Sequence, residues 1–241
     1  AAVDHRTIVI LFSMMIVVAN LKLAGFFELT GQLLRTVSAT QARLLLAVIF
    51  ASGLLSALCI NDIVCLLFTP VVLAVCKKTG APPLPYLLAT AMASNIGSAA
   101  TLLGNPQNIL VASLSGLPFT AYLLTALPFS LIGLFALYGL LWQNYRSLLA
   151  APLPAPDATA PVCHPYLIAK ALGVLTLVLG GYALGGDLAL LSGLGGALLL
   201  VTRRVKPNKI YTSIDFNLLV MFIGLFVVVG GVEKSGLMTA L

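Results

Sequence analysis

Long apolar runs separated by short polar clusters dominate the pattern of this chain. Residues 79–145 contain no Asp, Glu, Lys, Arg or His, and runs long enough to cross the ~30 Å hydrocarbon core of a bilayer recur throughout. The pattern therefore predicts an all-α integral membrane protein with several spans. The predicted elements, in order, are a span at 7–27, a re-entrant hairpin at 44–76, a broken helix at 84–114, a span at 119–142, a Pro-rich linker at 147–165, a helical pair at 166–202 and a further span beginning within 215–241.

The apolar region 44–76 is divided in its middle by the polar pair Asn61 and Asp62. Its arms, 44–58 and 63–76, would each extend only ~22 Å as helix, which is less than a full crossing. Both feet carry basic residues, which favour the cytoplasmic side of a membrane. We therefore predict a re-entrant hairpin whose feet lie in the cytoplasm. The basic residues at its feet are Arg35, Arg43, Lys77 and Lys78.

The segment 95–108, NIGSAATLLGNPQN, interrupts the next apolar region with small and polar residues. Non-helical backbone at membrane depth is tolerated only where it is buried in protein or lines a water-filled cavity. Gly97 and Gly104 are expected to adopt backbone conformations closed to other residues, and Pro106 stops the helix. The segment therefore predicts a binding site. Its side-chain oxygens and amides come from Asn95, Ser98, Thr101, Asn105 and Asn108.

Asp62 is the only acidic residue in the middle of a predicted membrane-embedded element, which makes it a candidate for binding a cation or proton. Asn61 or Asp62 is also expected to cap a helix that starts at Ile63. Oxygen ligands suit sodium, and the helix after the break would offer its N-terminus to an anion. Close helix packing is the alternative role for the glycines. The candidate sodium ligands are Asn61, Asp62, Ser98, Thr101 and Asn105.

The charge distribution indicates orientation. Of 13 Lys and Arg residues, the predicted layout places ten on the cytoplasmic side. The net charge of +6 falls in short clusters between apolar runs, so we expect membrane lipid and no nucleic acid as a partner. The linker at 147–165 is rich in proline and lacks an apolar period long enough to insert, and it is predicted to be cytoplasmic.

An internal repeat relates the start of the chain to its last span. An offset of 211 residues aligns Asp4 with Asp215, Val9 with Val220 and Gly25 with Gly236, among five identities in 23 positions. The span count predicts that the two copies run in opposite directions. Inverted repeats, a broken helix and a midplane polar site are together typical of secondary transporters. The second copy stops after one span, so we expect the chain to be a fragment holding half of a site.

Other classes of site find little support in the residues. The four cysteines form no CxxC pair and have no metal-ligand spacing with His5 or His164, so we expect buried apolar roles and no cofactor. Because arsenite is thiophilic, Cys59 and Cys65 are a side hypothesis as ligands. No protease or hydrolase motif is present, which argues against an enzyme. A passive channel remains an alternative, because re-entrant loops also build pores.

Three segments resemble the ion transporter superfamily, which includes arsenite permeases, citrate and dicarboxylate/sodium symporters and sodium/proton antiporters. They are SALCINDIVCLLFTP (56–70), ASNIGSAATLLGNPQN (93–108) and FNLLVMFIGLFVVVGGVEKSGL (216–237). In that superfamily the hairpin tip and the loop of the broken helix jointly hold sodium and part of the substrate. The resemblance thus implies these roles for Asn61, Asp62, Gly97, Ser98, Thr101, Gly104, Asn105 and Asn108.

The hairpin tip departs from the family pattern. Dicarboxylate symporters typically carry Ser-Asn-Thr there and antiporters place Asp before Asn, whereas this chain has Ile60-Asn61-Asp62. An added carboxylate favours a cation and repels a multiply charged anion. We therefore expect a sodium- or proton-coupled permease for a small inorganic or carboxylate anion, with a sodium/proton antiporter as the alternative. The expected setting is a bacterial-type plasma (inner) membrane, with a homodimer as a possible assembly.

Overall fold

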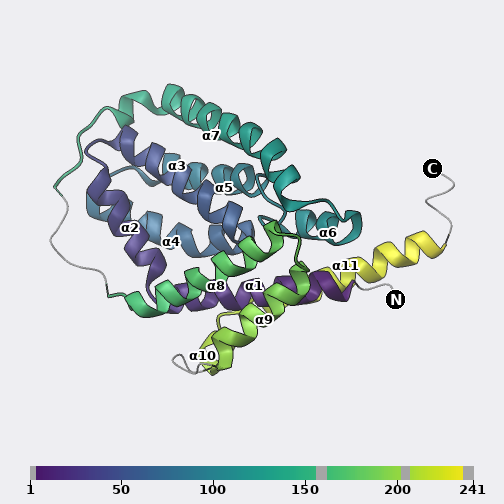
Figure 1. The fold of residues 1–241 in the computed structure, drawn as a ribbon. Helices are drawn as coiled ribbons and strands as arrows, with labels where there is room; N and C mark the ends of the chain where they lie inside the picture. Colours follow the sequence, from purple (N-terminus) through teal and green to yellow (C-terminus); the bar gives the residue numbers. More distant parts are fainter. Residues whose placement is uncertain (1–3, 156–161, 202–206, 236–241) are drawn as a thin grey trace.

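The computed structural model describes residues 4–155, 162–201 and 207–235, and these ranges fold into helices without a β-strand (Figure 1). The predicted all-α fold is therefore confirmed. The helices are α1 (His5–Leu23), α2 (Phe26–Val37), α3 (Gln41–Leu58), α4 (Asn61–Thr79), α5 (Pro83–Ser98), α6 (Pro106–Ser115), α7 (Phe119–Leu149), α8 (Pro165–Ala183), α9 (Leu188–Val201), α10 (Pro207–Tyr211) and α11 (Phe216–Lys234).

Four helices in the described residues, α1, α3, α7 and α8, are long and apolar enough to cross a membrane, and α9 and residues 216–232 of α11 are shorter apolar stretches. Burial separates them into inner and outer helices. All five consecutive residues from Met14 to Val18 in α1 are buried, so this helix is covered on every side. In contrast, α7 exposes Leu124, Phe129 and Ile132 along the edge of the molecule, as expected for a lipid-facing helix (Figure 1).

The two predicted arms form as helices joined by a tight turn, but the expectation that each arm is too short to cross a membrane was wrong for α3, which is long and apolar enough to do so. The arms α3 and α4 have 18 and 19 residues, or about 27 and 28 Å at 1.5 Å per residue, and only Cys59 and Ile60 separate them. The Tyr86 hydroxyl, near the start of α5, donates a 3.1 Å hydrogen bond to the carbonyl oxygen of Gln41 at the start of α3. Both feet of the hairpin therefore lie at one end of the molecule.

Backbone hydrogen bonds connect the segment after α7 to the foot of α3. The backbone N–H of Gln41 donates to the carbonyl of Ala151 at 3.2 Å, and Leu153 N–H donates to the carbonyl of Ala39 at 3.1 Å. The N–H of His164 donates to the carbonyl of Ala24, beyond the end of α1, at 2.8 Å. Helix α7 runs seven residues past the predicted end at 142, and residues 156–161 of the predicted linker lie outside the described residues.

Polar side chains join three elements at the opposite end. Asp4, which caps α1, accepts a 2.7 Å hydrogen bond from the Ser113 hydroxyl of α6. Arg6 forms an ion pair with Asp187, between α8 and α9. The molecule thus has one end that carries the hairpin feet and another at which α1, α6 and the α8–α9 turn meet.

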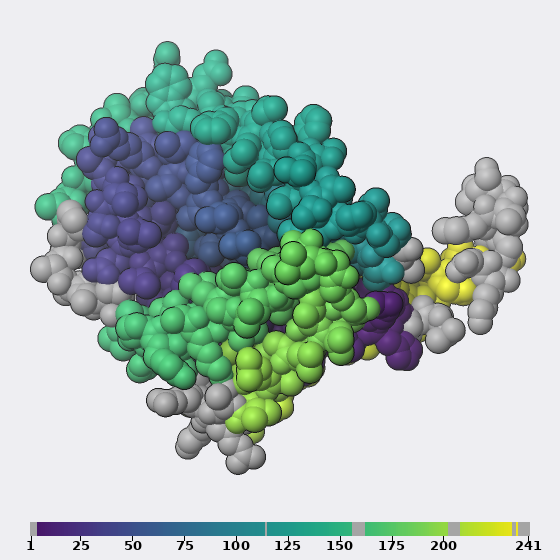
Figure 2. Space-filling view, in the orientation of Figure 1, coloured from purple at the N-terminus to yellow at the C-terminus, as the bar shows by residue number. Residues whose placement is uncertain are grey.

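The helices α1 and α11 have the same length and the same kind of N-terminal cap. Each has 19 residues, and the bounds of α11 are those of α1 shifted by the repeat offset, from His5 to Phe216 and from Leu23 to Lys234. Asp4 accepts hydrogen bonds from the N–H groups two and three residues later, and Asp215 does the same with Asn217 and Leu218. The two helices run in opposite directions, with α11 projecting beyond the packed body (Figures 1 and 2).

Candidate functional site

The break between α5 and α6 lies against the tip of the hairpin. The backbone N–H of Asn61, the first residue of α4, donates a 2.9 Å hydrogen bond to the carbonyl oxygen of Gly104 in the break. The hydroxyl of Thr101 donates to the carbonyl of Ala57, in the last turn of α3, at 2.6 Å. Each arm of the hairpin is therefore bonded directly to the break, as two elements that share a site would require.

Gly97 and Gly104 have ordinary backbone angles, and their role is to let neighbouring backbone segments approach closely. Neither has a positive φ angle, which is found among the described glycines at Gly25, Gly80, Gly116 and Gly185. A Cβ atom at Gly97 would overlap the backbone of Gly53 in α3, and one at Gly104 would overlap the backbone of Ser98. The expectation of special backbone conformations was wrong, and the packing alternative describes both glycines.

A chain of side-chain hydrogen bonds connects the polar residues across the joint. The Asn61 amide donates to Asn95 Oδ1 at 3.1 Å, and the Ser98 hydroxyl donates to the carbonyl of Asn95 at 2.8 Å. Asn105 Nδ2 in turn donates to Ser98 Oγ at 3.3 Å. The hydroxyl of Ser98 is almost completely buried. These four residues form one network that runs from the hairpin to the start of α6.

Asn105 and Asn108 organise the start of α6. The Asn105 side chain accepts a 2.7 Å hydrogen bond from the N–H of Asn108, and the carbonyl of Asn105 accepts from Ile109 at 3.1 Å. Pro106 has no N–H to offer, so Gln107 carries the remaining free N–H group of this turn among the described residues. The helix end that was expected to attract an anion is therefore mostly satisfied by its own cap.

Tyr122 of α7 belongs to the same network and was missed by the sequence analysis. Its hydroxyl accepts a hydrogen bond from Asn108 Nδ2 at 3.1 Å and donates to the carbonyl of Ala99 at 3.1 Å. Asn108 Nδ2 also donates to the carbonyl of Thr101 at 2.8 Å. No local pattern marks Tyr122 out, because it lies within an apolar helix and reaches the break only through tertiary folding.

Asp62 lies in the first turn of α4 and is exposed. Its carboxylate has no hydrogen-bond partner among the described residues. The helix starts at Asn61, and its N-cap residue, Ile60, makes no side-chain cap bond. The expectation that Asn61 or Asp62 caps a helix starting at Ile63 was therefore wrong. The carbonyl oxygen of Gly104 accepts the hydrogen bond from the N–H of Asn61 at the start of α4. The carboxylate of Asp62 therefore makes no cap and can bind a cation.

Two kinds of unsatisfied group remain at the joint. Asn61 Oδ1 is buried and receives no hydrogen bond from the described residues. The backbone N–H groups of Asp62 and Ile63, at the positive end of the α4 helix dipole, also have no acceptor there. The joint therefore offers an orphaned oxygen and a carboxylate to a cation, and two N–H groups to an anion.

Two of the four cysteines, Cys59 and Cys65, lie on the hairpin near the joint. Cys65 Sγ lies 2.8 Å from the Ser94 hydroxyl, and Cys59 is buried in the turn that links α3 to α4. No group of three or more His, Cys, Asp or Glu side chains comes together within the described residues. The side hypothesis that Cys59 and Cys65 bind arsenite gains no third ligand in this part of the chain.

Comparison with known proteins places these features in a family. The sequence model for the citrate transporter family matches residues 1–241. An uncharacterized transporter of Mycobacterium tuberculosis is 34% identical over 251 residues, which covers all of this chain and 59% of that protein. The inner membrane protein YbiR of Escherichia coli is 28% identical over 227 residues, covering 94% of this chain and 59% of that protein.

A plant protein matches a shorter stretch. The silicon efflux transporter of rice, Oryza sativa subsp. japonica, is 40% identical over 134 residues, which is 56% of this chain and 28% of the rice protein. The chain thus spans less than two thirds of the length of the curated relatives it matches.

Proposed function

The chain belongs to the citrate transporter family, and from this premise we propose that the full-length protein is an ion-coupled secondary transporter that moves a small anion by alternating access. The observation that carries the proposal is the joint between Asn61 and Gly104. It brings a membrane-embedded carboxylate, an orphaned amide oxygen and free helix N–H groups to one place. Relatives that are named transporters support transport over catalysis.

The coupling ion is a cation held at the hairpin side of the joint. A buried acceptor without a donor costs about 1–3 kcal/mol, and sodium bound at Asn61 Oδ1 and Asp62 would remove that cost. Ser98 and Asn105 lie next to Asn61 in the network and can complete the shell. Thr101 is a weaker ligand, because its hydroxyl already donates to Ala57 and accepts from the N–H of Leu103.

The substrate is a small inorganic or carboxylate anion, of the arsenite, citrate or dicarboxylate kind. Residues 79–145 provide no basic side chain, so anion binding in this half relies on the N–H groups of Asp62 and Ile63 and on the bound cation. The family name supports a carboxylate, and the rice relative supports a small inorganic solute.

In this proposal the described residues form half of the complete transport site. The chain spans 59% of the Mycobacterium tuberculosis relative, and α11 repeats the length and cap of α1 in the opposite direction. A second hairpin and a second broken helix in the full-length protein would supply the remaining ligands, and movement of this pair of elements would expose the site alternately. We propose that the full-length protein is a multi-pass component of a bacterial plasma membrane and assembles as a homodimer.

A sodium/proton antiporter is the second candidate, because Asp62 is exposed and carries the only acidic side chain at the joint in the described residues. Reconstituted vesicles separate the two functions. Sodium and pH gradients are imposed, and uptake of citrate, succinate and arsenite is followed together with internal pH. Saturable anion uptake driven by either gradient supports the permease. A sodium-driven pH change that needs no anion supports the antiporter, and a conductance without saturation contradicts both.

A further inference from the structure

Asn95 of α5 and Asn61 of α4 are linked through their side-chain amides. Asn61 Nδ2 donates a 3.1 Å hydrogen bond to Asn95 Oδ1, and Asn95 Nδ2 donates a 3.0 Å hydrogen bond to the carbonyl oxygen of Ala91, one turn earlier in α5. These three groups form an amide relay. We propose that Asn95 is a positioning residue, which orients the Asn61 amide so that Asn61 Oδ1 faces the coupling cation. This inference rests on the proposed function, in which Asn61 Oδ1 binds that cation.

The donors and acceptors of the amide relay fit together in only one order. A backbone carbonyl accepts hydrogen bonds and cannot donate them, so the end of the Asn95 amide beside Ala91 is its NH₂ group. Asn95 Oδ1 is therefore the end beside Asn61. Because an amide oxygen also only accepts, the nearer end of the Asn61 amide is its NH₂ group. The carbonyl of Ala91 thus fixes the orientation of both amides.

This orientation decides which atom of Asn61 is left for a ligand. Asn61 Oδ1 is buried and receives no hydrogen bond from the described residues. Turning the amide over would relieve this unfavourable state only by bringing Asn61 Oδ1 against Asn95 Oδ1, and two acceptors do not bond. The amide relay therefore holds an oxygen, and not an NH₂ group, where a cation can bind.

Asn95 acts through Asn61 in this arrangement. Both ends of the Asn95 amide are engaged in the relay, and its side chain is exposed, whereas Asn61 is buried. Without the acceptor on Asn95, the Asn61 amide could turn and present its NH₂ group, which repels a cation. The loss of Asn95 should therefore weaken cation binding even though Asn95 is not itself a ligand.

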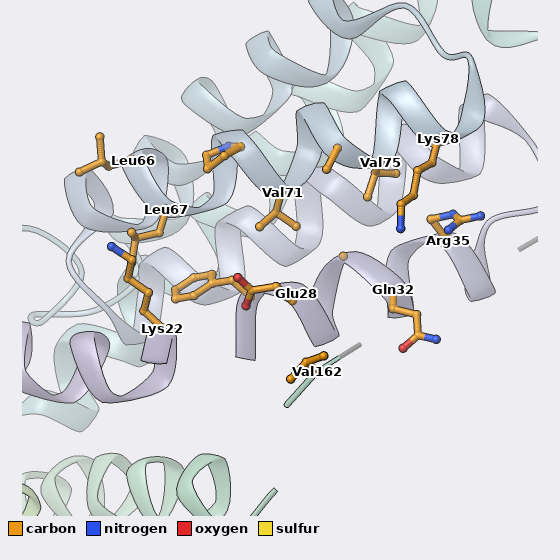
Figure 3. A pocket seen from close by; sticks show the side chains of 14 residues that line it. Lys22, Glu28, Gln32, Arg35, Leu66, Leu67, Val71, Val75, Lys78 and Val162 are labelled. Carbon is orange, nitrogen blue, oxygen red and sulfur yellow. The ribbon is translucent and has the colours of Figure 1, made fainter. Parts of the chain in front are cut away.

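The backbone that carries the Asn61 amide is held on several sides. The N–H of Asn61 bonds to the carbonyl of Gly104, and one turn further along α4 Cys65 Sγ lies 2.8 Å from the Ser94 hydroxyl of α5. On another face of α4, Val71 lies against α2 beside a pocket of about 920 Å³ (Figure 3). Because these contacts hold the helix in place, the amide relay controls the remaining freedom, which is rotation of the Asn61 side chain.

Sodium binding to the purified full-length protein tests the amide relay. Equilibrium binding of radioactive sodium is measured for Asn95→Leu, which keeps the approximate size of the side chain and removes both of its polar ends. We expect the Kd for sodium to rise about tenfold. Asn144→Leu is the matched control, because Asn144 Nδ2 donates the same kind of bond, at 2.7 Å, to the carbonyl of Leu140 near the other end of α7. This control should leave the Kd unchanged.

A double-mutant cycle separates positioning from direct binding. Asn61→Asp presents an oxygen whichever way its side chain turns, and Asn61→Ser has no amide to orient and adds no charge beside Asp62. Adding Asn95→Leu to either variant should change the Kd for sodium less than about twofold, because the orientation that Asn95 enforces no longer matters.

Two results would overturn the positioning role and leave the proposed function intact. An equal loss from Asn95→Leu in every Asn61 background would make Asn95 a cation ligand or a purely structural residue. An unchanged Kd for Asn95→Leu in the otherwise unaltered protein would mean that Asn95 does not orient Asn61. In contrast, failure of the unaltered full-length protein to bind sodium would contradict the proposed sodium site itself, and this inference with it.

Discussion

Asn61 and Gly104 are joined by a 2.9 Å hydrogen bond from the backbone N–H of the first to the carbonyl oxygen of the second. The bond satisfies a donor at the start of α4 with an acceptor in the break, so each element completes the other. The Thr101 bond to Ala57 repeats this arrangement on the other hairpin arm. We conclude that the hairpin tip and the break form one structural unit.

Substitution of Gly97 tests the close packing behind that unit. Gly97→Ala would place a Cβ against the backbone of Gly53, and we expect a loss of about 1–3 kcal/mol of stability together with reduced transport. Gly139→Ala in α7 is the matched control, because nothing lies within 4 Å of its added Cβ. Thermal unfolding in detergent measures both. Equal melting temperatures for the two variants would contradict the packing role of Gly97.

Polarity within apolar runs was enough to predict a turn between two helices at Asn61 and Asp62, the break, and the proximity of their polar residues, but it did not predict the length of the arms. It did not predict the helix start at Asn61, because an Asn-Asp pair before an apolar run has the local appearance of a cap. In the folded protein Gly104 supplies the acceptor instead. The glycines were misread for a similar reason, since only the approach of Gly53 and Ser98 reveals that they provide space.

Features fixed by tertiary contact had no signal in the sequence. Tyr122 reaches the break from another helix, and its hydroxyl is recognisable as part of the site only from its bonds to Asn108 and Ala99.

Removal of the Tyr122 hydroxyl tests its role in positioning the break. Tyr122→Phe loses two hydrogen bonds, each worth about 1 kcal/mol, and should raise the KM for the transported anion by up to about thirtyfold. Tyr138→Phe, on the same helix, removes a hydroxyl without a hydrogen-bond partner in the described residues and should leave KM unchanged. Equal KM values in both variants would remove Tyr122 from the site.

Asp4 gives the fold a pH-dependent contact between α1 and α6. Burial by itself would raise the pKa of Asp4, but hydrogen bonds from the Thr7 and Ser113 hydroxyls and from the N–H groups of Arg6 and Thr7 lower it below the ordinary value. Since the pKa is lower in the folded state, the carboxylate stabilises the protein above its unfolded-state pKa. That contribution is lost as the pH falls through the folded-state pKa.

Melting temperatures across pH check this contact. The difference between the unaltered protein and Asp4→Asn should be constant near neutral pH and should shrink below about pH 4. Ser113→Ala removes one of the hydroxyl donors and should show a smaller version of the same loss. A difference that persists undiminished at pH 3 would contradict an ionised Asp4 in the folded state.

The carboxylate of Asp62 tests the central claim most directly, because the proposed transport cycle requires a cation at the joint. The measurement is the sodium and proton dependence of anion uptake in vesicles that contain Asp62→Asn. Asp187→Asn is the control, since it removes an exposed carboxylate that pairs with Arg6 away from the joint. We predict that Asp62→Asn abolishes the cation dependence or weakens it at least about tenfold, while Asp187→Asn retains it. Unchanged cation dependence in Asp62→Asn would contradict the account.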